Sequence, residues 1–420
     1  MSPSLSNKKA LVYDWGSFGH TAANLATEFA EVWYHVPWVA GYPTSKPALI
    51  GKDLETQGVE RVRDFDAYVD KADLIVFPDC YCYDRVDFLR RHGYRVWGAG
   101  KAEELEIERI KAKTIIAEAG LPSTDYEIIK GFDKLRKYVA AHPKDIFIKG
   151  SLFRGDIETY QVKDLASFEA WIDKEAQKLG RPRQETVEFI VEQKIDGVEF
   201  GYDDSTVDGQ FSGITAWGYE NKDLGYIGQV CDYDDLPKPL KIVNAALAPW
   251  LRDYGARTFF HSEVRWGKEK KPYLIDPCLR SGNPPSQTLY KILGNWPQRI
   301  WAGADGENVD HTKLYNFGAQ IQLYSPWCET DFLPVTVEKE AEDWIILKNA
   351  TILHGQRYIV PTGQDMIGAA IGAGDTLKEA CEMALKHARM ISGMELEYDA
   401  TALDGAMEQL KEGRDYGIQW

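Results

Sequence analysis

One lysine of this chain occupies a position suited to binding phosphate. In "DIFIKG" (145–150) an apolar strand pattern ends in Lys149, and a loop that carries Arg154 follows. A strand-end ammonium group, a guanidinium group and the N–H groups of a closing loop can together neutralise phosphate oxygens. Lys113, on a predicted helix upstream, would add a third cation. The pattern predicts a nucleoside triphosphate site with a lid at 150–157, whereas Lys149 taken alone also fits a solvent-exposed strand end.

A second predicted strand ends among carboxylates. The segment "FIVEQKIDGVEF" (189–200) runs into Glu192, turns at Asp196-Gly197 and continues to Glu199. The edge of such a strand can offer main-chain groups to a purine ring, and carboxylates can accept hydrogen bonds from an exocyclic amine or from ribose hydroxyls. This turn is therefore predicted to contact the nucleotide.

Two further acidic residues lie on strands that are predicted to pair. "FFHSEVRW" (259–266) carries Glu263 and "PYLIDPCLRSGNPPSQ" (272–287) carries Asp276, with a short polar turn between them. Mg²⁺ prefers carboxylate and phosphate oxygens, so the two residues predict a metal site. Alternation along the second strand would place Arg280 on the face of Asp276, where a guanidinium group can hold an anion.

The N-terminal part of the chain is predicted to form an open α/β layer. Apolar strand patterns alternate there with helical ones, an order typical of parallel pairing. The glycine turn after the first strand is G-x-x-G and lacks the complete G-x-G-x-x-G spacing, so a dinucleotide-dependent dehydrogenase is not favoured. The predicted strands are "KKALVYDW" (8–15), "VWYHVPWV" (32–39), "ADLIVFPD" (72–79) and "YRVWGAG" (94–100).

From residue 101 the pattern changes to that of an α+β region. "AEELEIERIKAKTIIAEAG" (102–120) predicts one long helix that stops at Gly120. Strand patterns then dominate as far as "PYLIDPCL", with helices predicted at 166–180 and 239–255. A last segment, from about residue 316, combines strands with the predicted helix "DTLKEACEMALKHARMIS" (375–392).

Composition excludes several classes of protein. The formal net charge of −16 disfavours a large surface for the phosphates of duplex nucleic acid. No apolar run reaches the roughly 20 residues that span a bilayer, and the N-terminus lacks the apolar middle of a secretion signal, so a cytoplasmic protein is expected. Cys80 and Cys82 form the one close pair among six cysteines, which predicts reduced thiols. His20, His35 and His261 are interpreted as structural.

In this order the motifs resemble the ATP-grasp superfamily and, within it, the phosphoribosylamine–glycine ligase family. The family's lysine-bearing helix and "gIPT" turn resemble "ERIKAKTIIAEAGLPSTDY" (108–126), and its strand lysine matches Lys149. Its hinge IEEFLDGEE resembles "VEQKIDGVE" (191–199), and its EFNVRFGDPETQ aligns with "DPCLRSGNPPSQ" (276–287). The ending "GAGDTLKEACEMALKHARMISG" (372–393) is similar to the family's C-terminal domain.

The resemblance assigns a role to each matched residue. It implies ATP and Mg²⁺ or Mn²⁺ as the cofactors. Phosphate or nucleotide contacts fall to Lys113, Lys149, Glu192, Lys194 (through its backbone) and Glu199, and metal binding to Glu263 and Asp276. Catalytic roles fall to Arg280, as a substrate-side cation, and to Arg154, as the cation of the phosphate loop.

The departures from the family concern its substrate half and its metal site. Cys278 replaces the family's metal-binding asparagine and is a poor ligand for hard Mg²⁺, which leaves either one or two metal sites. "GNPP" lacks the carboxylates of GDPE, and "FPDCYCYD" (77–84) stands where the family has its GPE motif for phosphoribosylamine. We therefore expect a retained ATP half and a different amine substrate.

The resemblance implies a three-part chain of α/β and α+β class. A Rossmann-like domain at 1–105 precedes an ATP-grasp domain at 106–310 and a small α+β domain at 311–420. The implied reaction joins a small carboxylate, with glycine as the first candidate, to an amine such as a metabolite or a modified nucleotide, and it releases ADP and phosphate. The alternative is a regulatory or scaffold protein that binds ATP without turnover. The sequence does not indicate the oligomeric state.

Overall fold

The computed structural model describes residues 4–37, 49–142, 144–151 and 159–420. The first sheet in chain order is parallel. Its strand order is β3-β2-β1-β4-β5, and every pairing within it is parallel. The expected α/β layer is thus confirmed, with one strand, β3, that the sequence did not suggest. The bounds are β1 (Lys9–Tyr13), β2 (Glu31–His35), β3 (Val59–Arg61), β4 (Leu74–Val76) and β5 (Val96–Trp97), with α1 (Gly19–Leu25), α2 (Asp66–Val69) and α3 (Tyr83–Arg91) between them.

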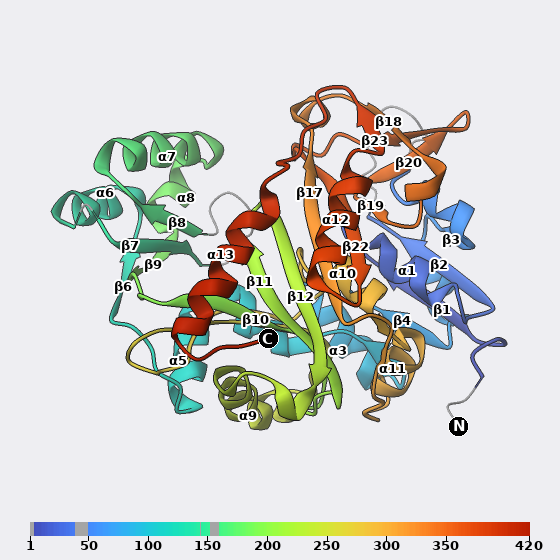
Figure 1. The fold of residues 1–420 in the computed structure, drawn as a ribbon, viewed down its shortest axis with the longest axis horizontal. Coiled ribbons are helices and arrows are strands. Elements are labelled where there is room, and N and C mark those ends of the chain that lie inside the picture. The colour runs from blue at the N-terminus through green and yellow to red at the C-terminus, as the bar shows by residue number, and fades with distance from the viewer. Residues whose placement is uncertain (1–3, 38–48, 143, 152–158) are drawn as a thin grey trace.

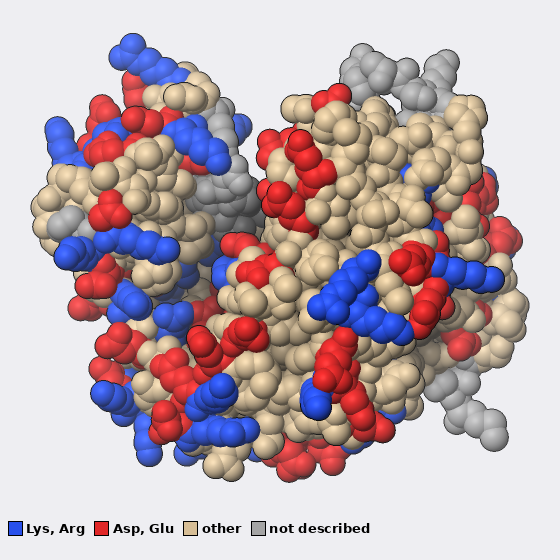
Figure 2. Space-filling view, turned by 45° about the horizontal axis from the view of Figure 1, so that its top comes forward, with Lys and Arg blue, Asp and Glu red and all other residues tan. Residues whose placement is uncertain are grey.

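A small antiparallel sheet with its own helices forms a separate lobe, seen in green at the left of Figure 1. Its order is β6-β9-β7-β8, and the apolar faces of α6 and α7 pack on it, with Leu135, Val139, Phe168 and Ile172 fully buried. Figure 2 shows that the molecule is hollowed between this lobe and the larger body. The bounds are β6 (Tyr126–Lys130), β7 (Ile146–Gly150), β8 (Thr159–Val162), β9 (Glu188–Gln193), α6 (Phe132–Ala141), α7 (Leu165–Lys178) and α8 (Arg181–Thr186).

The larger body is built on an eight-stranded antiparallel sheet of order β14-β13-β10-β11-β12-β17-β22-β19. Strands from 317–374 therefore continue the same sheet as strands from 198–278. Helix α9 (Lys238–Asp253) packs beside β10 and β13. Helix α12 (Leu377–Ala388) lies over β22 and β17, and α13 (Ala402–Asp415) lies over β11 and β12 (Figure 1). The strands are β10 (Val198–Val207), β11 (Ile214–Asn221), β12 (Gly225–Asp232), β13 (Arg257–Trp266), β14 (Tyr273–Cys278), β17 (Phe317–Tyr324), β19 (Ile345–Leu347) and β22 (Met366–Gly374).

The remaining elements connect or cover these sheets. A four-stranded sheet of order β20-β21-β18-β23 lies in the C-terminal part. The bounds are β18 (Leu333–Val337), β20 (Ala350–Leu353), β21 (Gln356–Ile359), β23 (Ile391–Gly393), β15 (Leu293–Gly294), β16 (Thr312–Lys313), α9 (Lys238–Asp253), α10 (Ser286–Ile292), α11 (Trp296–Gly303), α12 (Leu377–Ala388) and α13 (Ala402–Asp415).

The single helix predicted over 102–120 is wrong. The segment forms two helices, α4 (Glu104–Ile107) and α5 (Arg109–Glu118), because Glu108 leaves the helical conformation at φ −97° and ψ 69°. The side chain of Glu106, two residues before the break, accepts a hydrogen bond from the Leu279 N–H at 2.8 Å. A contact with a distant strand end therefore accompanies a break that local helical periodicity does not predict.

Among the residues that the structure describes, no helix is both long and apolar enough to cross a membrane.

Candidate active site

Lys149 links the small lobe to the large sheet. It ends strand β7, and its Nζ donates to the carbonyl oxygen of Ile275 on β14 at 2.7 Å. The same Nζ lies 3.3 Å from Oε1 of Glu192 on β9, the neighbour of β7. The lysine side chain is 14% exposed. Contacts with both sheets therefore fix the Lys149 side chain at their junction, and the interpretation of Lys149 as a solvent-exposed strand end is wrong.

Glu192 is the centre of a buried cluster of cations. Lys113 of α5 forms a close ion pair with its Oε2, and the Thr124 hydroxyl donates to the same oxygen at 3.0 Å. Burial alone would raise the pKa of Glu192, but Lys149 and then Lys113 outweigh it and hold the pKa at about 2. Three residues far apart in the sequence thus meet, with the two predicted phosphate lysines side by side on one carboxylate.

Glu263 and Asp276 face each other across two paired strands, as the sequence predicted. They are directly opposite in the β13–β14 register, so their side chains share one face of the sheet. Both are half-buried. Ile275, which accepts the Lys149 hydrogen bond, immediately precedes Asp276. Lys149 and the carboxylate pair therefore line one junction.

Charge on this sheet face is concentrated and mostly negative. Burial, with Glu199 and Glu220 as neighbours, raises the pKa of Glu263 well above its usual range, although the Lys222 ammonium opposes the shift. Asp276 behaves oppositely: burial would raise its pKa, but Arg109, which lies 3.4 Å from its Oδ1, lowers it.

These residues fit a magnesium ion. Burial and the neighbouring carboxylates raise the pKa of Glu263; a divalent cation would neutralise the negative charge of those carboxylates, and carboxylate oxygens are its preferred ligands. Within the described ranges, no group of three or more His, Cys, Asp and Glu side chains is arranged to hold a metal. The Glu263–Asp276 pair would therefore have to share the ion with the phosphates of a nucleotide.

Arg280 lies close to this pair but in a different setting from the one predicted. Strand β14 ends at Cys278, so Arg280 follows the strand, and the prediction that strand alternation places it on the face of Asp276 is wrong. Its Nε donates to Oε1 of Glu106 at 2.8 Å, and its Nη1 donates to the Ser281 carbonyl oxygen at 3.0 Å. The guanidinium group is buried and fixed in place by α4.

The other residues predicted to contact the nucleotide are Glu199, Lys194 and Arg154. Glu199 forms a close ion pair with Arg265, which lies opposite it on β13. The N–H of Lys194 donates to the Asp145 carbonyl oxygen at 2.8 Å, so a main-chain contact with a purine would use its carbonyl group. Arg154, with most of the predicted lid, lies outside the described residues.

Sequence reasoning missed four side chains of this junction: Thr124, Arg109, Glu106 and Lys222. Arg109 is paired with Asp276 and Glu106 with Arg280, so both act on predicted residues. An Arg and a Glu inside a predicted amphipathic helix look like part of a solvated face. The available signal was that both occupy the segment before Lys113, where the helix was predicted to approach the phosphate site.

Comparisons with known proteins bear on the fold of the chain. No family model matches the chain. Phosphoribosylamine–glycine ligase from Thermotoga maritima superposes with a TM-score of 0.68 at 14% sequence identity, covering 93% of this chain and 99% of that one. The biotin carboxylase domain of 2-oxoglutarate carboxylase from Hydrogenobacter thermophilus, solved with MgADP and bicarbonate, gives a TM-score of 0.66 at 12% identity, covering 96% and 98%.

A third similar structure is N5-carboxyaminoimidazole ribonucleotide synthetase from Thermotoga maritima, with a TM-score of 0.57 at 13% identity, covering 93% of this chain and 100% of that one. All three likenesses extend over nearly the whole length of both chains. The chain therefore has the ATP-grasp fold, as its motifs predicted.

Proposed function

We propose that this protein is an ATP-dependent ligase that joins a carboxylate to an amine and releases ADP and phosphate. The observation that carries the proposal is the position of Lys149. Its ammonium group bonds the backbone directly before Asp276 and also contacts Glu192, which Lys113 shares. Phosphate-side cations and a metal-side carboxylate pair thus meet at one junction between two sheets, which suits the triphosphate of ATP.

The proposed reaction has two steps. A carboxylate oxygen of the first substrate attacks the γ-phosphorus of ATP, and the bond to ADP breaks. The amine nitrogen of the second substrate then attacks the acyl carbon, phosphate leaves, and the amine gives up a proton as the amide forms. Such chemistry depends on neutralising charge more than on a protein nucleophile.

The residues of the chain would divide this work. Lys113 and Lys149 would leave Glu192 in part and neutralise phosphate oxygens. Glu263 and Asp276 would hold Mg²⁺ or Mn²⁺, which supplies charge neutralisation and orientation of the phosphates when bound. We assign the substrate carboxylate or the acylphosphate to Arg280, with Arg154 as the cation of the lid.

The substrates are proposed from the likeness alone. Glycine is the first candidate for the carboxylate. We expect an amine other than phosphoribosylamine, because "FPDCYCYD" stands in place of the motif that the ligase family uses there. Small-molecule substrates fit a chain of net charge −16 better than duplex nucleic acid does.

One observation favours a second candidate, an ATP-binding regulatory protein without turnover. Cys278 occupies a metal-ligand position of the family, and burial raises the pKa of its thiol well above the usual range, so it stays neutral. Loss of a ligand would weaken metal binding and with it catalysis.

The test is a product-release assay. Purified protein receives Mg-ATP with a panel of amino acids and small amines, singly and in pairs, and ADP, AMP and phosphate are measured. ADP and phosphate that appear only when a carboxylate and an amine are both present support the ligase. Binding of Mg-ATP without product from any pair would favour the regulatory candidate.

A further inference from the structure

A buried histidine occupies the next row of the sheet face that carries the carboxylate pair. His261 lies opposite Cys278 on β14 and opposite Asp203 on β10. Glu263 follows His261 by two residues on β13, so both side chains point to the same face, about 7 Å apart along the strand. His261 is 4% exposed. His261 is therefore a buried neighbour of the carboxylate pair on the same face of the sheet.

The hydrogen bonds of His261 define which ring nitrogen carries the proton. The Gly282 N–H donates to Nε2 at 3.0 Å, so Nε2 is an acceptor without a hydrogen. Nδ1 then carries the hydrogen and donates to Oδ1 of Asp203 at 3.1 Å. Asp203 also accepts from the Tyr226 hydroxyl at 2.6 Å. Two buried side chains thus fix the imidazole in the form that can accept from Gly282.

Glycines make room for this arrangement. A Cβ at Gly218 or at Gly228 would lie 2.5 Å or 2.6 Å from the Tyr226 hydroxyl oxygen. Gly218 and Gly228 are paired on β11 and β12, and the Tyr226 ring lies against both positions. Side chains there would displace the tyrosine from Asp203.

The N–H group that donates to His261 is that of Gly282, which lies in the same segment as Arg280. Three N–H groups of this segment have acceptors from three different elements. Leu279 donates to Glu106 of α4, Ser281 to the Pro78 carbonyl oxygen after β4, and Gly282 to His261 of β13. Because Arg280 is flanked by these anchors, the location of its guanidinium group depends on all three.

We propose that His261, oriented by Asp203 and Tyr226, is a positioning residue that holds the segment 279–282 and so places Arg280 for the carboxylate substrate. The role at the substrate rests on the ligase function proposed above. The hold on the segment is a property of the folded chain alone. The two parts can therefore be tested separately.

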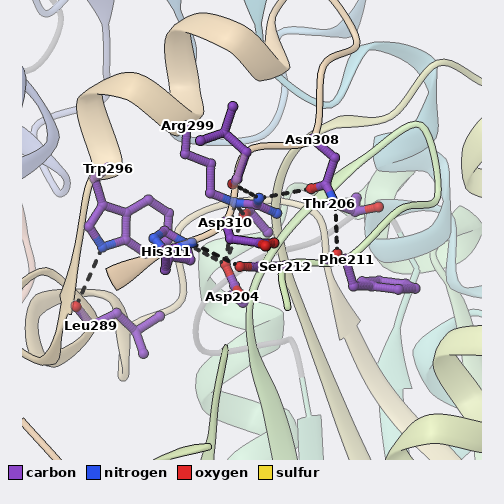
Figure 3. A network of polar contacts seen from close by, with 12 residues as sticks. Asp204, Thr206, Phe211, Ser212, Leu289, Trp296, Arg299, Asn308, Asp310 and His311 are labelled. Carbon is purple, nitrogen blue, oxygen red and sulfur yellow. Dashed lines mark hydrogen bonds and ion pairs between the residues drawn. The ribbon is translucent and has the colours of Figure 1, made fainter. Parts of the chain in front are cut away.

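The chain offers a matched control on the other face of the same strand. Asp204 follows Asp203 on β10 and points the opposite way. It accepts from the ring of His311 at 2.9 Å and lies beside the fully buried Arg299 (Figure 3). His311→Asn therefore disturbs a buried His–Asp contact of the same kind, away from Arg280.

The experiment compares His261→Asn, His261→Gln and His311→Asn. An asparagine can keep the bond to Asp203 but is too short to reach Gly282, whereas a glutamine amide oxygen can replace Nε2 as the acceptor. Hydrogen–deuterium exchange over residues 279–286 is expected to accelerate in His261→Asn only. Binding of Mg-AMP-PNP, a non-hydrolysable ATP analogue, is expected to match wild type in all three variants.

With a substrate pair from the product-release assay, kcat/KM for the carboxylate should fall about tenfold to a hundredfold in His261→Asn, chiefly through KM. His261→Gln should restore most of it, and His311→Asn should leave it unchanged. Wild-type exchange over 279–286 in His261→Asn, or an equal loss in His311→Asn, would overturn the proposal. If wild type releases no product with any pair, the ligase function fails, and the exchange result alone decides whether His261 holds the segment.

Discussion

Replacing Lys149 with methionine removes the charge that joins the two sheets and keeps most of the apolar stem. The ammonium group now contacts Glu192 at 3.3 Å and the Ile275 carbonyl oxygen at 2.7 Å. Glu192 would keep its pairing with Lys113 and its hydrogen bond from Thr124. The variant is therefore expected to fold.

The expected loss is in nucleotide affinity. A hydrogen bond to a charged group contributes about 1.5–3 kcal/mol, and 1.4 kcal/mol corresponds to about a tenfold change in Kd. Since the Lys149 side chain is 14% exposed, solvent screens the contact only weakly, and the upper half of that range applies. The Kd for Mg-AMP-PNP should rise about 40-fold to 150-fold.

Isothermal titration calorimetry measures this Kd, with Lys130→Met as the matched control. Lys130 is on β6 of the same sheet and pairs with Glu188 of β9 at 3.8 Å, but it is 56% exposed. The Lys130→Met variant should bind the nucleotide with the affinity of the wild type. Unchanged affinity in Lys149→Met, or an equal loss in Lys130→Met, would refute the assignment of Lys149 to the phosphates.

Three further predictions concern charge. Lysine neighbours lower the pKa of Glu192 to about 2 despite burial, so its ionised form stabilises the fold above about pH 4.5, and that stability is lost as the pH falls toward 2. Glu192→Gln should cost about 3 kcal/mol in urea unfolding at pH 7 and much less at pH 3; an equal cost at both would contradict the pairing. Burial and then Asp79 raise the pKa of Asp14 to about 6, so wild type should lose up to about 3 kcal/mol as the pH rises from 4 to above 6. Asp14→Asn should remove this slope, and an unchanged slope would show that another group causes it. Cys278→Asn should lower the Mg²⁺ concentration that gives half-maximal turnover; an unchanged concentration would mean that position 278 has left the metal site.

The arrangement of candidate residues that the sequence predicted well is the one set by local strand pairing. Glu263 and Asp276 lie on strands joined by a short turn, so their register follows from a hairpin. The shared contact of Lys113 and Lys149 with Glu192 joins three distant segments, and no local rule gives it. The contact forms only when the small antiparallel sheet, which carries Lys149 and Glu192, packs beside helix α5, which carries Lys113.

The missed elements have physical reasons as well. Strand β12 (Gly225–Asp232) was not among the predicted strands, because Gly225 and Gly228 weaken a strand pattern. Gly228 is needed because the Tyr226 ring occupies the space of a side chain. His261 was interpreted as structural because a lone histidine on an apolar strand usually is. Its partner Gly282 lies beyond the next strand, and nothing in the spacing indicates that the two meet.

The most direct test of the proposed chemistry follows one oxygen atom. A carboxylate substrate labelled with ¹⁸O at the carboxyl group is turned over with unlabelled ATP and the amine, and the released phosphate is analysed by mass spectrometry. The acylphosphate route predicts one ¹⁸O atom in each phosphate, because the carboxylate oxygen that attacks the γ-phosphorus leaves with it. Phosphate without label would contradict the route and would indicate that water, not the substrate carboxylate, attacks ATP.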